Sequence, residues 1–250
     1  MDSTKNFSGL ADTYTAGRPA YAAEFVHSLY TEHGFSPQTV IADIGAGTGK
    51  FAKQLLDRGS TVYCVEPNDD MRETAAQELG CYSGFHAVRG TADATGLPDA
   101  SVDFVTTAQA FHWFDPDAFR AECGRILKPG GKAFLIWNLR DMTAELNRHS
   151  YEIHVKYCPR FKGFGGGIQE NDPRIGRFFG GAYDCVVFEH PLCYDRENFL
   201  NRSLSGSYSL RAGDPAYVAY LAALGTLFDE YAENGILTMP NQTVVYYGSM

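Results

Sequence analysis

The segment Asp43-Ile44-Gly45-Ala46-Gly47-Thr48-Gly49 decides the fold of this chain. It follows a short apolar run, Thr39–Ile44, and precedes the segment Lys50–Arg58, in which apolar residues recur at helical spacing. The glycines therefore lie where a strand turns into a helix. Glycines at such a turn let a ligand approach the backbone closely, and the helix N-terminus directs its N–H groups toward that ligand. The segment predicts a ligand site at a strand–helix turn.

The alternation of strands and helices continues through the first half of the chain. Further apolar runs typical of buried strands lie at Thr61–Val65, Phe85–Val88, Val102–Thr107 and Ala133–Trp137. Helical patterns separate them at Asp69–Leu79 and Asp117–Leu127, and the second of these ends at a proline–glycine turn signal. Buried strands that alternate with helices predict a mostly parallel sheet with helices on both faces.

The second half of the chain has a different pattern. Residues 141–181 contain no clear strand, and we interpret them as a helical cap inserted into the domain. Strand signals return at Cys185–Phe188 and Thr243–Tyr247, and a helical stretch, Pro215–Tyr231, lies between them. We therefore expect residues 1–250 to form a single domain from which the cap is an excursion.

Composition and charge exclude several classes of protein. The chain has 250 residues, of which 44% are hydrophobic, so a buried core is expected and disorder is excluded for most of the chain. No apolar run approaches the ~18 residues of a membrane helix, and the first ten residues lack the apolar core of a signal peptide. The net charge of −9 disfavours nucleic acid, whose phosphates are held mainly by Lys and Arg. We expect a soluble, cytoplasmic protein with neither a membrane nor a nucleic-acid partner.

The cysteines and histidines give no sign of a metal site. The six cysteines are widely spaced with no CxxC pair, and the seven histidines are scattered. Structural zinc sites use closely spaced pairs of ligands, and disulfide scaffolds are shorter and denser in cysteine. We expect buried free thiols and no bound metal.

Lys50 and Asp43 distinguish the glycine-rich turn from a dinucleotide site. The dinucleotide fingerprint would place its third glycine at position 50, where this chain has Lys50. Asp43, two residues before the first glycine, would repel a pyrophosphate but suits a cationic or amine-bearing ligand. Glu66 ends the next predicted strand, where an acid can accept hydrogen bonds from both ribose hydroxyls of an adenosine. The pattern favours an adenosine ligand that carries a positive charge.

Residues 40–138 resemble the class I S-adenosylmethionine-dependent methyltransferases. The matching pieces are VIADIGAGTGK, VYCVEPN, GTADATGLPDASVDFV, AQAFHWF and ILKPGGKAFLIWN. The flanks resemble the small-molecule subgroup (methyltransferase type 11-like, trans-aconitate methyltransferase-like), with an N-terminal lid in residues 1–36 and a final antiparallel strand at 243–248. The resemblance implies a Rossmann-like, seven-stranded, mostly parallel α/β sheet whose last strand is antiparallel, with the lid and the helical cap added.

The resemblance also implies which residues bind the cofactor S-adenosylmethionine. Those lining its methionine and ribose parts would be Asp43, Gly45, Ala46 and Gly47. Those at the ribose hydroxyls and the adenine would be Glu66, Pro67, Met71, Ala92 and Asp93. Those bordering the methionine after the fourth strand would be Gln109, Ala110 and Phe111. Those closing over the cofactor from the lid would be Tyr14 and Arg18. Many relatives carry an acid where Thr91 stands, which would shift the role of Asp93 by two positions.

Methyl transfer from this cofactor needs little from the protein besides alignment and desolvation. Proximity can supply about 7–11 kcal/mol. A carboxylate acceptor needs no general base, whereas a phenol, thiol or amine can need one. His112 is the candidate base, and a structural imidazole is the alternative. Candidate acceptor contacts are Trp113, Trp137 and Tyr157.

The segment 156–162 places three cations among aromatic residues. It either attracts an anionic acceptor or forms a solvated basic face.

We expect methyl transfer from S-adenosylmethionine to a small-molecule acceptor, either a carboxylate or a hydroxyl. Two alternatives come from other classes. A nicotinamide-dependent oxidoreductase is disfavoured by Asp43 and Lys50. A catalytically silent methyltransferase-like binding protein is disfavoured because Asp43, the glycines and Glu66 are all present.

Overall fold

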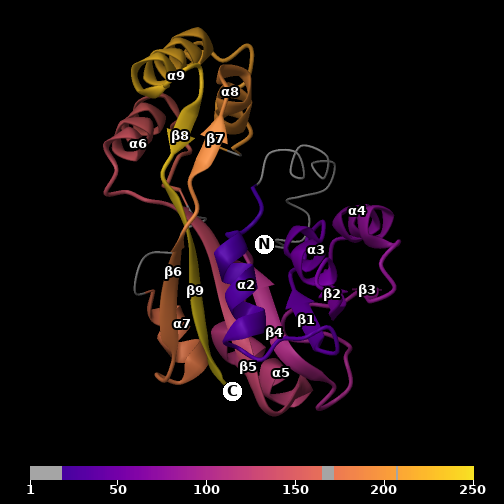
Figure 1. Ribbon diagram of the computed structural model, residues 1–250. Coiled ribbons are helices and arrows are strands. Elements are labelled where there is room, and N and C mark those ends of the chain that lie inside the picture. The colour runs from indigo at the N-terminus through magenta and orange to yellow at the C-terminus, as the bar shows by residue number, and fades with distance from the viewer. Residues whose placement is uncertain (1–18, 165–171, 207) are drawn as a thin grey trace.

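The computed structural model describes residues 19–164, 172–206 and 208–250 (Figure 1). Its main sheet has seven strands in the order β3-β2-β1-β4-β5-β9-β6. Their bounds are β1 Val40–Ile44, β2 Thr61–Val65, β3 Phe85–Val88, β4 Val102–Ala108, β5 Leu127–Arg140, β6 Asp184–Glu189 and β9 Asn241–Ser249. Strand β9 runs antiparallel to both of its neighbours, and the other pairs are parallel. The predicted mostly parallel sheet with an antiparallel last strand is confirmed.

Helices cover both faces of this sheet and bury two hydrophobic clusters against it. The helices on one face are α5 (Pro116–Ile126) and α7 (Pro173–Phe179). Those on the other face are α2 (Ala23–Thr31), α3 (Lys50–Leu56) and α4 (Asp69–Leu79). Along β5, Leu135 and Trp137 belong to the first cluster, whereas Phe134 and Ile136 belong to the second. Successive side chains of a strand point to opposite faces, so a strand covered on both faces must be apolar throughout.

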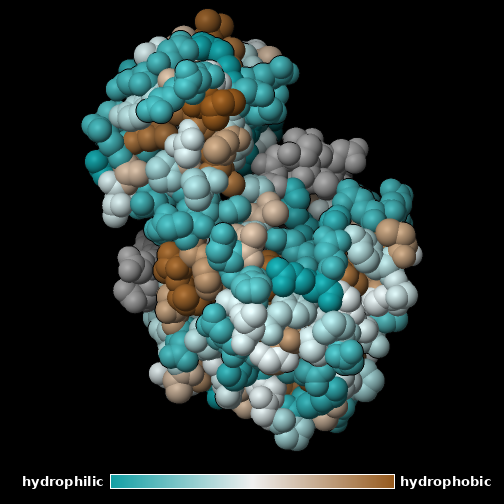
Figure 2. Space-filling model, in the orientation of Figure 1, coloured by the Kyte–Doolittle hydropathy of each residue, from teal (hydrophilic) through white to brown (hydrophobic). Residues whose placement is uncertain are grey.

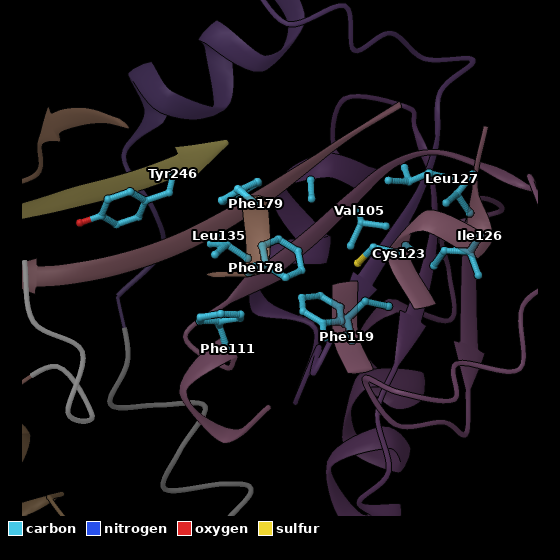
Figure 3. Close-up of a cluster of buried hydrophobic side chains, with 14 of the residues drawn as sticks. Val105, Phe111, Phe119, Cys123, Ile126, Leu127, Leu135, Phe178, Phe179 and Tyr246 are labelled. Atoms are coloured by element: carbon cyan, nitrogen blue, oxygen red, sulfur yellow. The ribbon is translucent and has the colours of Figure 1, made fainter. Parts of the chain in front are cut away.

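Aromatic rings fill the first cluster. Figure 3 shows Phe111, Phe119 and Phe178 pointing toward one another beneath the sheet. The ring centroid of Phe178 lies 5.4 Å from that of Phe111 and 4.9 Å from that of Phe119. These contacts hold α7 against α5 and the sheet.

A cap lies beyond the carboxyl ends of the parallel strands (Figure 1). Its elements are α6 (Glu145–Tyr157), β7 (Leu192–Tyr194), α8 (Arg196–Leu204), α9 (Tyr217–Tyr231) and β8 (Leu237–Met239). They share a third hydrophobic cluster that includes Phe199, Tyr220 and Leu224, and β7 pairs with β8 in a small sheet of its own. The cap is therefore built from two stretches of chain, before α7 and between β6 and β9.

The structure divides the segment 141–181, for which the sequence predicts a cap. Helix α6 lies in the cap, whereas α7 covers the main sheet. Ile175, Phe178 and Phe179 of α7 are buried in the first cluster, and this apolar face draws the helix to the sheet. Elements β7, α8 and β8 were not expected from the sequence.

Strand β5 also differs from its predicted bounds. It begins at Leu127 rather than Ala133, so the predicted turn at Pro129 lies inside the strand. The turn residues form an irregularity in the pairing, because Val102 pairs with Leu127 but Phe104 pairs with Lys132.

The cysteines correct another expectation. No disulfide joins the six cysteines, all of which lie in the described part of the chain. Three are buried as expected, but Cys81, Cys185 and Cys193 are exposed.

Some large hydrophobic side chains are exposed on the surface. Figure 2 shows hydrophobic residues gathered on the cap, where Val155, Val218 and Ile236 are exposed. Within the described ranges no helix is both long enough and apolar enough to cross a membrane.

The placement of α7 predicts a large loss of stability on truncation of Phe178. Phe178→Ala removes a fully buried ring and should lower the free energy of unfolding by about 3–5 kcal/mol. Arg177→Ala, on the exposed side of the same helix, removes only a surface ion pair with Asp117. This variant should change the free energy of unfolding by about 1 kcal/mol or less. Denaturant unfolding measures both. Equal losses would contradict the packing of α7 on the core.

Candidate active site

The glycine-rich loop between β1 and α3 is anchored on the carboxyl end of β2. The N–H groups of Gly45 and Ala46 donate to the Val65 carbonyl oxygen at 2.9 and 3.2 Å. Gly45, Gly47 and Gly49 have φ values of 69°, 57° and 77°. Glycine adopts this left-handed conformation without the steric penalty of a side chain. The repeated glycines are thus a requirement of the backbone.

The three glycines differ in what surrounds them. A Cβ atom on Gly45 would lie 2.6 Å from the Ala110 Cβ, and one on Gly49 would lie 2.4 Å from the Leu79 Cδ1. A Cβ on Gly47 would meet nothing within 4 Å. Gly45 and Gly49 are therefore needed for packing, whereas Gly47 borders open space in which a ligand can approach the backbone.

Glu66 lies at the end of β2 and contacts this loop directly. Its Oε2 accepts a hydrogen bond from the Gly47 N–H at 2.9 Å, and its Oε1 accepts one from the Asn68 N–H at 2.9 Å. Burial raises the pKa of Glu66, and the two backbone hydrogen bonds oppose that rise. Each carboxylate oxygen can accept a second hydrogen bond, so the group retains capacity for ligand hydroxyls.

Asp43 lies at the base of the site, near the end of β1. Its Oδ1 accepts a hydrogen bond from the Thr106 hydroxyl at 2.8 Å. Its Oδ2 is buried and has no hydrogen-bond partner among the described residues. The pKa of Asp43 is raised to about 7, mainly by burial. The Thr106 hydrogen bond opposes this rise, and the negative charge of Glu66 contributes to it. A cationic group beside Oδ2 would stabilise the charged carboxylate.

Gln109 follows β4 in a conformation that is rare for a residue with a side chain. Its φ is 58°, a strain of about 1–3 kcal/mol that is typical of functional sites. Its Nε2 donates a hydrogen bond to the Asn138 carbonyl oxygen at 2.9 Å. Its backbone N–H donates one to the Ile136 carbonyl oxygen, also at 2.9 Å. The segment after β4 is thereby fixed to the end of β5.

The residues after Gln109 have different positions. Ala110 lies against Gly45 and brings this segment to the glycine-rich loop. Phe111, predicted to border the cofactor, has a fully buried side chain that points into the core instead (Figure 3). His112 is half-buried in the short 3₁₀ helix η2 (Phe111–Trp113), and its carbonyl oxygen accepts from Arg174 at 3.4 Å.

The predicted adenine contacts lie beyond the ends of β2 and β3. Pro67 is half-buried, and Met71 is buried in the first turn of α4, where its N–H donates to the Asn68 side chain at 3.0 Å. Ala92 is half-buried and Asp93 is exposed in a tight turn. Two further predicted cofactor contacts, Tyr14 and Arg18, lie outside the described residues.

The candidate acceptor residues are scattered. Trp113 is 49% exposed, and Tyr157 is half-buried in the cap, 6.0 Å from the Tyr220 ring centroid. Trp137 is fully buried, with its ring centroid 6.1 Å from that of Phe111 and 6.0 Å from that of Tyr246. This packing contradicts a place for Trp137 in an acceptor pocket, because its side chain faces α5 and α7 rather than the cap.

The basic segment 156–162 of the cap lies at the surface. The three cations of this segment are exposed, which agrees with a solvated basic face; they are Lys156, Arg160 and Lys162. In the part of the chain that the structure describes, no three His, Cys, Asp or Glu residues are grouped to hold a metal ion.

Sequence reasoning missed several residues of the site. Thr106, the partner of Asp43, carried one signal, since it is a polar residue near the end of an otherwise apolar strand. Asn68, which caps α4 and donates to Glu66, carried the signal of a helix N-cap.

Comparison with known proteins finds similarity to methyltransferases. A family model described as a methyltransferase domain matches residues 42–135, which include Asp43, Glu66 and Gln109. The chain is 37% identical over 140 residues to an uncharacterized methyltransferase of Mycobacterium tuberculosis, covering 56% of this chain and 55% of that protein. It is 33% identical over 140 residues to a methyltransferase-like protein of Schizosaccharomyces pombe, covering 56% of this chain and 54% of that protein. The chain thus spans about half the length of the curated relatives it matches.

Solved structures share the fold of this protein over nearly the whole chain. A protein of Anabaena variabilis described as an antibiotic-pathway methyltransferase superposes with a TM-score of 0.64 at 21% identity, covering 94% of this chain and 99% of that one. A protein of Anaeromyxobacter dehalogenans described as a type II methyltransferase gives 0.60 at 21% identity, covering 92% and 95%. At this identity the likeness shows the fold alone.

The glycine geometry predicts unequal effects of two alanine substitutions. Gly47→Ala should lower the free energy of unfolding by about 1–2 kcal/mol, the penalty of its left-handed conformation alone. Gly49→Ala should lower it by more, because the added Cβ also overlaps Leu79. Denaturant unfolding compares the two variants. A larger loss for Gly47→Ala would contradict the described loop.

The raised pKa of Asp43 predicts a pH-dependent gain in stability on its replacement. Between about pH 4 and pH 7 the folded protein keeps a proton on Asp43 that the unfolded chain has lost, so this group's contribution to the free energy of unfolding falls as pH rises. Asp43→Asn removes that contribution. The variant should therefore gain stability relative to the parent protein from pH 4 to pH 8, by about 1–4 kcal/mol.

Denaturant unfolding across this pH range measures the difference. Glu24→Gln, at an exposed position on α2, is the matched control. A difference between Asp43→Asn and the parent that does not change with pH would show that Asp43 is not a buried acid with a raised pKa.

Proposed function

We propose that this protein transfers the methyl group of S-adenosylmethionine to a small-molecule acceptor. The observation that carries the proposal is the contact of the Glu66 carboxylate with the Gly47 N–H, beside the buried Asp43. The residues present fit the cofactor. Open space borders Gly47, the Oδ2 of Asp43 lacks a partner among the described residues, and Glu66 retains acceptor capacity.

Each side chain has a defined role in this proposal. Glu66 would accept hydrogen bonds from the two ribose hydroxyls, and Asp43 would face the cationic part of the ligand. Those that would pack on the adenine or meet its edge are Pro67, Met71, Ala92 and Asp93. Bound at this site, S-adenosylmethionine supplies an activated methyl group.

The protein's own contribution is mainly alignment. The Gln109 side chain is held by the Asn138 carbonyl oxygen, and Ala110 packs against Gly45, so the wall beside the methionine part is rigid before a ligand binds. Such preorganisation is worth about 7–11 kcal/mol when the reacting atoms are held in line. A carboxylate acceptor would need no proton transfer. For a hydroxyl acceptor, His112 remains the candidate base.

The structure favours this function over a nicotinamide-dependent oxidoreductase. Asp43 is buried at the glycine-rich turn, where an ionised carboxylate would repel a pyrophosphate. Helix α3 begins at Lys50, which stands where the dinucleotide fingerprint has its third glycine. A silent binding protein has no particular observation in its favour.

The proposed ribose contact predicts a loss of cofactor affinity when Glu66 is changed. Glu66→Ala should weaken binding of S-adenosylhomocysteine by about 1.5–3 kcal/mol, the usual contribution of a hydrogen bond to a charged group. Glu66→Gln should lose less, because one acceptor oxygen remains. Glu78→Gln, at an exposed position on α4, is the control and should bind like the parent.

Calorimetric titration gives these affinities, and far-UV circular dichroism checks that each variant is folded. An unchanged affinity for Glu66→Ala would remove Glu66 from the site.

A further inference from the structure

We infer that the cap contains an anion-binding site centred on Arg140, which holds a non-reacting carboxylate or phosphate group of the methyl acceptor. This inference rests on the proposed function and adds the chemical class of the acceptor. Arg140, Ser150 and His154 form the site, and Arg202 lies near it.

Arg140 is a cation that has no carboxylate partner within residues 19–164, 172–206 and 208–250. It ends β5, and its guanidinium donates to the Ser150 hydroxyl at 2.8 Å and lies 3.8 Å from the Phe164 ring centroid. No carboxylate contacts it among the described residues. Burial lowers the pKa of Arg140 to about 10, so the group is still charged at neutral pH. Charges inside proteins are normally paired, and a guanidinium has five N–H donors to satisfy.

In the described part of the chain, the groups that act electrostatically on Arg140 include no carboxylate. They are the side chains of three tyrosines and one further arginine: Tyr194, Tyr208, Tyr220 and Arg202. Arg202 donates to the Ser205 hydroxyl at 3.2 Å. The chain as a whole has a net charge of −9, so two neighbouring arginines with no carboxylate beside them in the described ranges are unusual in it. Their combined field attracts an anion.

His154 supplies a second, independent observation. It is fully buried on α6, and its Nδ1 lies 2.6 Å from the Ser150 carbonyl oxygen, to which it donates. Its Nε2 is buried and has no hydrogen-bond partner among the described residues. Arg140 and His154 both contact Ser150, and both lie against the Phe164 ring. The neutral ring therefore offers one acceptor atom beside the cation.

This pair of groups selects a particular kind of ligand. Arg140 recognises an anionic oxygen, and the Nε2 of His154 accepts from a nearby O–H or N–H. A hydroxycarboxylate carries both features, and so does a hydrogen phosphate. The exposed cations Lys156, Arg160 and Lys162 of the same cap show no such enclosure.

The position of Arg140 suits a group that does not react. It follows Asn138 by two residues, and the Asn138 carbonyl oxygen contacts Gln109 at the proposed methionine site. A strand rises about 3.3 Å per residue, so the Cα of Arg140 lies about 7 Å further along β5. A small acceptor with its anionic group at Arg140 can therefore extend its reacting atom toward the cofactor.

The test is a titration of the full chain with malate and with inorganic phosphate, with and without S-adenosylhomocysteine. Malate tests a carboxylate source and phosphate tests a phosphate source. We expect at least one probe to bind the parent protein, and Arg140→Met to weaken that binding by about tenfold or more. Arg160→Met, which removes an exposed cation of the same cap, should bind the probe like the parent. Arg140→Met should bind S-adenosylhomocysteine like the parent.

Two results would overturn the inference: binding of neither probe to the parent protein, or retention of probe affinity within about twofold by Arg140→Met. If Arg140→Met does not fold, His154→Phe replaces it, because this change fills the same space while removing Nε2. It should weaken probe binding several-fold, and an unchanged affinity would count against the site. Failure of the parent to bind S-adenosylhomocysteine would contradict the proposed function instead, and the anion titration without that ligand would still decide the cap site.

Discussion

The hydrogen bond from the Gly47 N–H to the Glu66 carboxylate joins the two segments on which the rest of the site depends. It fixes the glycine-rich loop to the end of β2, where the Val65 carbonyl oxygen already accepts two N–H groups from that loop. The same arrangement places Glu66 near the buried Asp43, and the proximity of the two acids helps to raise the pKa of Asp43. A cationic group beside Asp43 would relieve this repulsion. The arrangement of the two acids thus suits the proposed ligand, with a cation at Asp43 and hydroxyls at Glu66.

The strands and the glycine-rich turn could be predicted from the sequence, because their signals are local. A strand buried on both faces is apolar throughout, as in β5, and left-handed backbone requires glycine, as at Gly45 and Gly49. The cap could not be predicted in the same way. Helices α6 and α7 are both amphipathic, and only long-range contacts such as that of Phe178 with Phe119 decide which one covers the sheet.

Side-chain direction was the other limit of prediction. Trp137 and Phe111 stand close to the site in the sequence, yet their rings fill the core, since both faces of the sheet are apolar and the sequence pattern does not distinguish them. Arg140 carries no local signal of a binding site in the sequence. An arginine after an apolar strand is typical of an exposed strand end, and only the fold encloses it beneath the cap with His154. The proposed cofactor end of the site therefore depends on local sequence motifs, whereas the proposed acceptor end depends on tertiary packing.

Calorimetric titration of the unmodified protein with S-adenosylhomocysteine, run beside NADH, tests the central claim most directly. The Asp43, Gly47 and Glu66 geometry predicts binding of S-adenosylhomocysteine and no binding of NADH. Binding of NADH in place of S-adenosylhomocysteine would contradict the account, because a site that accepts a pyrophosphate cannot hold an ionised Asp43 at its base.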